Sequence, residues 1–136
     1  MKWSVAVVLC LAFAVVFAIT AEEGREKFKK AHEKCQTDPA TAADEEELKA
    51  YKTEHKVTEG IKIHALCVSK TLGWQHQDGK INKESVKEKI VLYLGQTPKL
   101  DEIHAECVVD KENEKETAIN LFKCYYKYFA HKTSKQ

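Results

Sequence analysis

The chain has 136 residues, of which 43% are hydrophobic, and its 22 Lys and Arg residues nearly balance 21 Asp and Glu residues. This balance argues against a nucleic-acid-binding protein, which needs a basic patch to meet the phosphates. The length is typical of a single domain with a modest core.

The apolar residues are concentrated at the amino terminus. A mostly apolar run over residues 5–19 follows Lys2, and small residues suited to cleavage continue to Ala21. This run of 15 residues is shorter than the roughly 20 that a membrane-spanning helix needs. The pattern therefore predicts a secretory signal peptide over residues 1–21. We expect residues 22–136 to form one secreted, extracellular domain without stable membrane insertion.

Removal of residues 1–21 from the 136 leaves a domain of 115 residues with balanced charge. Lys2 is the only charged residue lost, so 21 basic residues face 21 acidic ones. Of the five cysteines only Cys10 is lost, which leaves four. Sustained two-residue alternation is absent, and apolar residues recur at helical spacing, so the sequence predicts an all-α fold.

Six helices are predicted, and the first covers about residues 25–36. The second opens at Thr41, whose hydroxyl caps the helix while Asp44 reaches back, the pattern of a capping box. Gly60 breaks this helix. Its inward face is formed by Leu48, Tyr51 and His55.

The third helix covers about residues 61–72 and stops at Gly73. A loop follows over residues 74–81. The fourth helix starts at Asn82 as its N-cap and ends at Gly95, which we expect to adopt a left-handed conformation.

The last two predicted helices lie between Thr97 and the carboxyl terminus. Thr97 caps the fifth, with Pro98 at its first position, and Asn113 opens the sixth. Helices of this length are marginal alone, so we expect a compact domain of short crossing helices held by covalent crosslinks. The inward residues are Leu100, Ile103 and Cys107 on the fifth helix and Ala118, Leu121, Phe122, Tyr125 and Phe129 on the sixth.

Four cysteines in a short secreted domain indicate two disulfides. The sequence alone does not choose among the three possible pairings. A rival interpretation is zinc binding by three His-x-x-Cys pairs, each on one helix face. Oxidation is favoured outside the cell, so we predict disulfides and neither a metal nor a cofactor. The cysteines are Cys35, Cys67, Cys107 and Cys124, and the three pairs are His32/Cys35, His64/Cys67 and His104/Cys107.

Three parts of the chain occur in a distinctive order. Cys35 closes a charged first helix, residues 67–82 read CVSKTLGWQHQDGKIN, and residues 116–126 read ETAINLFKCYY. In order and spacing they resemble the insect odorant-binding proteins, the pheromone/general odorant-binding fold. The resemblance implies an enclosed hydrophobic cavity between crossing helices. It also implies the disulfides Cys35–Cys67 and Cys107–Cys124.

The chain departs from the usual six-cysteine pattern of that family. The family's second and fifth cysteines pair with each other, and their positions are occupied here by Ile63 and Lys115. The chain is therefore similar to the four-cysteine, or minus-C, subgroup. We expect the third helix and the start of the sixth to open more readily than in a six-cysteine relative.

No catalytic motif is present, so we predict that the protein is not an enzyme. The resemblance implies a carrier that encloses a small hydrophobic molecule, such as an odorant, a pheromone or a lipid-like metabolite. The alternative is a secreted structural or signalling protein with a filled core that acts through its surface. The sequence does not decide whether the protein also binds a second copy of itself, as a homodimer, or a receptor. The candidate ligand-binding residues are Phe28, Leu66, Leu72, Trp74, Val86, Ile90, Tyr93, Leu94, Ile103, Val108, Leu121, Phe122, Tyr125 and Phe129.

Two expectations concern the tail and the histidines. The polar segment after Phe129 is poorly suited to an apolar cavity, so we expect an exposed tail that does not expel ligand. The chain has six histidines, a residue type whose ordinary pKa is near 6.5, so we expect stability or binding to depend on pH.

Overall fold

The computed structural model of the protein describes residues 22–130, and this part of the chain is all-α, as predicted. The predicted signal peptide and residues 131–136 of the tail lie outside the described residues. The first helix covers residues 22–37. It is followed by α2 (Glu45–Glu54), α3 (Glu59–Thr71), α4 (Lys83–Leu94), α5 (Leu100–Cys107), α6 (Glu114–Cys124) and the π-helical segment η1 (Tyr125–Phe129). Within residues 22–130, no helix is both long and apolar enough to cross a membrane.

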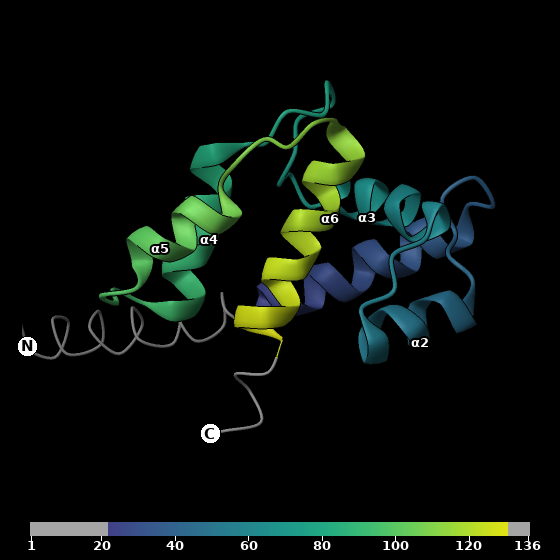
Figure 1. The fold of residues 1–136 in the computed structure, drawn as a ribbon, viewed down its shortest axis with the longest axis horizontal. Helices are drawn as coiled ribbons and strands as arrows, with labels where there is room; N and C mark the ends of the chain where they lie inside the picture. Colours follow the sequence, from purple (N-terminus) through teal and green to yellow (C-terminus); the bar gives the residue numbers. More distant parts are fainter. Residues whose placement is uncertain (1–21, 131–136) are drawn as a thin grey trace, which may run out of the picture.

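Helix α6 is the element around which the others are arranged. Figure 1 shows α4 and α5 on one side of α6 and α2 and α3 on the other. Helix α3 makes the most extensive contact with it. Because neighbours cover α6 on several sides, six of its residues are buried, among them the polar Thr117. A helix that is buried over most of its circumference is a core helix.

Two disulfides join helices that are distant in sequence. Cys35–Cys67 links the first helix to α3, and Cys107–Cys124 links the carboxyl ends of α5 and α6. These are the pairings that the family resemblance implies. The zinc interpretation of the His-x-x-Cys pairs is wrong, because the sulfur atoms of the cysteines are bonded to one another. In the chain-entropy account, loops of this size give about 3–4 kcal/mol of stabilisation per disulfide.

Three of the predicted helix ends are confirmed by hydrogen bonds or backbone angles. The side chain of Asn82 accepts a bond from the Ser85 amide at 3.3 Å, and that of Asn113 accepts one from the Glu116 amide at 3.0 Å. Gly73 follows α3 with a φ of 77°, a conformation that side chains disfavour. Side-chain caps can be recognised in a sequence, because only certain residue types accept hydrogen bonds from the first amides of a helix, which have no partner within the helix.

The predicted start of α2 at Thr41 is wrong. The N-cap is Asp44, whose carboxylate accepts bonds from the amides of Glu46 at 2.8 Å and Glu47 at 3.4 Å. The Thr41 hydroxyl instead donates to the Cys35 carbonyl at 2.8 Å, so it satisfies the end of the preceding helix. A carboxylate cap is also favoured by the helix dipole, which explains why Asp44 displaced Thr41.

The predicted end of α2 at Gly60 is also wrong. The helix stops at Glu54, and His55 takes the left-handed conformation with a φ of 57°. His55 is exposed and does not belong to the inward face. Gly60 lies in the first turn of α3, which Thr58 caps by accepting a bond from the Ile61 amide at 3.2 Å.

Two further helix ends differ from the predictions. Gly95 has a positive φ of 71° but a ψ of −170°, so it is not a left-handed helical cap. Helix α5 begins at Leu100, with Lys99 as its N-cap and no side-chain cap bond. The Thr97 hydroxyl accepts a long bond of 3.4 Å from the Lys99 amide, and Pro98 belongs to a turn before the helix.

The sequence did not predict the π-helical turn after α6. The Ala130 amide donates to the Tyr125 carbonyl at 3.0 Å, five residues back. The side-chain pattern of residues 125–129 suits an α-helix equally well. Extra residues per turn in such a segment change which side chains face inward, and such turns are frequent at functional sites.

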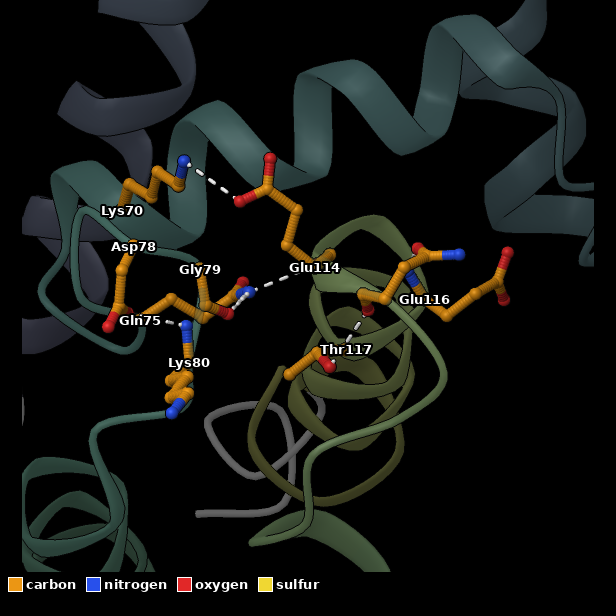
Figure 2. Close-up of polar contacts among 9 residues, drawn as sticks. Lys70, Gln75, Asp78, Gly79, Lys80, Glu114, Glu116 and Thr117 are labelled. Carbon is orange, nitrogen blue, oxygen red and sulfur yellow. Dashed lines mark hydrogen bonds and ion pairs between the residues drawn. The ribbon is translucent and has the colours of Figure 1, made fainter.

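Polar groups connect α3 and the loop that follows it to the start of α6, a contact that we call the α3–α6 seam. The family resemblance implies a third disulfide here in six-cysteine proteins. Figure 2 shows Gln75 donating to the carbonyls of Gly79 at 2.8 Å and Glu114 at 3.0 Å. Gly79 has a φ of 93°, and a side chain there would collide with that of Glu114. Three ion pairs cross the seam, namely Lys115–Glu59 at 2.5 Å, Lys62–Glu116 at 2.6 Å and Lys70–Glu114 at 3.2 Å.

We predict that the seam loosens with salt. Raising the ionic strength from about 0.05 M to about 1 M screens charges on the surface, so amide hydrogen exchange in the first turn of α6 should quicken roughly two- to fivefold. Amides beside Cys124 provide the internal control, because a covalent bond holds them. Equal acceleration at both ends of α6 would show that the ion pairs do not tie the seam.

Candidate functional site

A small apolar cavity, which we call the core cavity, lies between α4, the ends of α5 and α6, and η1. Its volume is about 20 Å³. A cavity needs roughly 10–15 Å³ on this measure to hold one water molecule, so the core cavity has room for about one. The residues that line it are Trp74, Val86, Lys89, Ile90, Tyr93, Cys107, Leu121, Cys124, Tyr125 and Phe129.

A second hollow, which we call the side pocket, adjoins the core cavity. It measures about 80 Å³ and shares Trp74, Lys89 and Tyr93 with the core cavity. These three side chains therefore form the boundary between the two spaces. The remaining lining residues include the exposed Glu23 and Lys27 of the first helix, so the side pocket reaches the surface.

Two larger hollows, of about 270 and 290 Å³, lie along the α3–α6 seam. Charged side chains such as Asp78, Asp110 and Glu59 line them. An apolar ligand gains little by contacting such groups, whereas ligand pockets are mostly apolar with few polar groups. The core cavity and the side pocket are therefore the better candidate site despite their smaller volume.

The predicted ligand-binding residues divide into three groups in the structure. Those that line the core cavity are Trp74, Val86, Ile90, Tyr93, Leu121, Tyr125 and Phe129. Leu72 lines the side pocket, together with Trp74 and Tyr93. Those that line neither space are Phe28, Leu66, Leu94, Ile103, Val108 and Phe122. Helical periodicity finds buried faces, but it does not separate a residue packed in the core from one that borders a space.

Phe28 illustrates the difference between these groups. Its ring stacks on that of Tyr125 with centroids 4.0 Å apart and planes 6° apart, and it also packs 5.8 Å from the Trp74 ring. Phe28 thus supports two residues of the cavity wall from behind. Burial, with a smaller contribution from Tyr93, raises the pKa of Tyr125 to about 12, so its hydroxyl stays neutral and able to donate a hydrogen bond.

Tyr93 and Gly24 are packed tightly where the first helix meets α4. A side chain at Gly24 would collide with the Tyr93 hydroxyl. The ring of Tyr93 also packs against Phe129, with centroids 5.1 Å apart. Gly24 therefore leaves room for Tyr93 to stand at the boundary between the core cavity and the side pocket.

Lys89 was not among the predicted site residues. It is half-buried, lies at that same boundary, and its ammonium donates to the Leu72 carbonyl at 3.4 Å. Burial lowers the pKa of Lys89, and the positive charge of Lys27 lowers it further. A signal was available, because residues 86, 89, 90 and 93 follow the spacing of one buried helix face. Lys89 is the charged residue on this otherwise apolar face, and it therefore identifies a polar group of the candidate site.

The buried His64 and the partly buried His32 form a pair apart from these cavities, beside the Cys35–Cys67 disulfide. His64 is fully buried, and its Nδ1 donates to the Thr41 carbonyl at 3.0 Å. The Nε2 of neutral His64 is then an acceptor, so Nδ1 of His32, at 2.8 Å, is the donor. Burial lowers the pKa of both histidines below 6.5. This network needs a neutral His64, because a proton on its Nε2 would face the N–H of His32.

We predict that the fold loses stability as the pH falls below about 6.5. Each histidine binds a proton more readily in the unfolded chain, so the free energy of unfolding falls through this range by at most about 1.4 kcal/mol per pH unit and group. Urea unfolding between pH 7.5 and 5 measures this slope. The H64Q variant should lose about 1–3 kcal/mol at pH 7.5 and show a flatter slope. Variant H76Q, which alters an exposed histidine, should keep the wild-type slope. A wild-type slope retained in H64Q would contradict the assignment.

Comparison with known proteins places this site in a family context. A model of the PBP/GOBP family matches residues 18–128. The B1 protein of Tenebrio molitor is 26% identical over 117 residues, which are 86% of this chain and 88% of that protein. The B2 protein of the same beetle is 24% identical over 117 residues, 86% of this chain and 91% of its own. No solved structure gave a significant match.

Proposed function

The chain belongs to the PBP/GOBP family, and on that premise we propose that it is a secreted carrier that reversibly encloses a small hydrophobic molecule. Candidate ligands are an odorant, a pheromone or a lipid-like metabolite. The observation that carries this proposal is an apolar core cavity that adjoins a side pocket reaching the surface. Encapsulation of this kind requires no chemical step.

The driving force for such binding is the removal of apolar ligand surface from water. At roughly 25 cal/mol per Å², a ligand that buries about 250 Å² gains on the order of 6 kcal/mol. Part of this gain is lost to the ordering of the ligand and of the side chains that it contacts. Binding in the micromolar range is therefore the expected scale.

The core cavity must enlarge to take such a ligand. At about 20 Å³ it is smaller than any odorant-sized molecule. Tyr93 and Lys89 are half-buried side chains at the boundary with the side pocket, whereas Trp74 is buried against Phe28. We infer that rotation of Tyr93 and Lys89 joins the two spaces, while Trp74 stays in place.

Secretion and subgroup membership are parts of the same proposal. Two disulfides are typical of proteins that mature in an oxidising compartment. The two absent cysteines, at Ile63 and Lys115, support membership of the minus-C subgroup. That subgroup resembles carriers of body fluids as well as olfactory ones, so the proposal is a carrier and not specifically an olfactory protein.

A second function is favoured by one observation, the near-complete filling of the core. A secreted helical protein that acts through its surface needs no cavity. Titration with phenylnaphthylamine, an uncharged apolar fluorophore, separates the two. Saturable binding with one site per chain supports the carrier, and absence of binding up to about 100-fold the expected micromolar dissociation constant supports the surface-acting protein.

We predict that filling the core cavity blocks the fluorophore. In V86F the larger side chain enters the cavity and should weaken binding about tenfold or more. V108F is the matched control, since Val108 is buried to 7% exposure against 6% for Val86 but does not line the cavity. Both variants should lose about 1–3 kcal/mol of stability through overpacking.

The comparison of the two variants decides the location of the site. Equal weakening in V86F and V108F would mean that stability and not the cavity controls binding. If V86F does not fold, the milder V86L replaces it, with V108L as its control.

A further inference from the structure

We propose that the ligand ends in a carboxylate and that Lys89 binds this group at the boundary between the core cavity and the side pocket. The ligand class is then a fatty-acid-like molecule, with its apolar tail in the core cavity and its charged end against Lys89. This inference rests on the carrier function proposed above and specifies the chemistry of the same site.

The position of Lys89 on α4 is the first support. Its neighbours on the same helix face, Val86, Ile90 and Tyr93, all line the core cavity. The half-buried side chain of Lys89 has lost part of its hydration, which is unfavourable unless a partner compensates its charge. Exposed lysines such as Lys83 and Lys87 already supply charge on α4, so solubility did not require a further charge at position 89.

The protein supplies only weak compensation for this charge. In the described part of the chain, the ion pairs involve Lys62, Lys70, Lys115 and Lys127. Lys89 has instead the Leu72 carbonyl at 3.4 Å, a long bond for a charged donor. An ammonium group has three protons to donate. A ligand acceptor at the boundary would therefore meet a donor whose hydrogen bonds are incompletely satisfied.

The surrounding charges favour an anion over a cation or a neutral group. Lys27 on the first helix lines the side pocket and is close enough to lower the proton affinity of Lys89. The acidic groups nearby are Glu23, which lines the same pocket, and Glu88, which adjoins Lys89 on α4, and both are exposed. A carboxylate between the two lysines gains charge-assisted hydrogen bonds that an alcohol or an ester does not. A ligand amine would be repelled.

The arrangement also fixes the direction in which the ligand lies. The core cavity has an apolar lining, whereas the side pocket adds Glu23 and Lys27 at the surface. The tail therefore enters first, between Tyr93 and Trp74, and the carboxylate stops at Lys89. Lys89 in this role is a specificity-determining residue, because the apolar contacts alone would accept any tail of suitable size.

The experiment is isothermal titration calorimetry of the full mature chain at about pH 7.5 with decanoate, decanol and methyl decanoate. The three share a tail, and only decanoate is charged at this pH. Wild-type protein should bind decanoate about tenfold or more tightly than the two neutral ligands. K89M keeps an apolar stem of similar length and should lose this preference while it binds decanol as before. K89R should retain part of the preference.

A matched control separates a direct contact from long-range charge. K87M removes the same charge from an exposed position two residues away on α4, so it should leave the decanoate preference unchanged. An equal loss in K87M and K89M would overturn the contact with Lys89, since net charge alone would then explain the preference.

The remaining outcomes test the carboxylate proposal separately from the carrier function on which it rests. Equal affinity of wild-type protein for decanoate and decanol would overturn the carboxylate proposal and leave the carrier function standing. Absence of binding for all three ligands and for phenylnaphthylamine would overturn both. If K89M does not fold, K89Q serves in its place, with K87Q as its control.

Discussion

The fold depends on covalent connection between helices that are too short to be stable alone. After the first helix of residues 22–37, the α-helices have between eight residues (α5) and thirteen (α3), and isolated helices of that length are marginal in water. Cys35–Cys67 and Cys107–Cys124 each remove conformations from the unfolded chain that these helices cannot exclude by propensity. Within that frame α6 packs against α3 and α5, and the aromatic residues of η1 complete the core.

The parts of the fold that follow from local chemistry could be predicted from the sequence. Asn82, Asn113 and Gly73 act through hydrogen bonds or backbone conformations that their own residue type determines. The start of α2 was missed because Thr41 and Asp44 are both good caps, and the Thr41 hydroxyl instead bonds the Cys35 carbonyl at the end of the first helix. The role of Gly60 was missed for a related reason, since Thr58 outweighs it by capping α3.

The sequence predicted the apolar helix faces that surround the site, but it did not predict which of their residues line a cavity. Val86, Ile90 and Tyr93 share a face with Lys89, so the sequence contained the charge that the apolar pattern leaves unexplained. The separation of Phe28 and Phe122 from the cavity wall depends on how aromatic rings stack in three dimensions. The π-helical turn that sets Tyr125 and Phe129 in the wall has no distinct side-chain pattern, so no reading of periodicity would have found it.

The α3–α6 seam is held by ion pairs and hydrogen bonds instead of a disulfide. At the positions where the six-cysteine pattern has a pair of cysteines, this chain has Ile63 on α3 and Lys115, which pairs with Glu59 one turn before Ile63. Ion pairs of this kind are weak individually and respond to salt, whereas a disulfide responds to reductant. The Gln75 side chain adds a fixed connection that salt does not screen, since both of its acceptors are backbone carbonyls.

The two disulfides differ in their position relative to the core cavity. Both sulfur-bearing residues of Cys107–Cys124 belong to the wall of the core cavity, whereas Cys35 and Cys67 line neither the core cavity nor the side pocket. Sulfur is polarizable and makes favourable contacts with apolar and aromatic groups, so one bridge is part of the surface that a guest molecule would touch. Reduction of that bridge would therefore change the wall of the core cavity itself, whereas reduction of the other bridge would affect a bound molecule only through the stability of the fold.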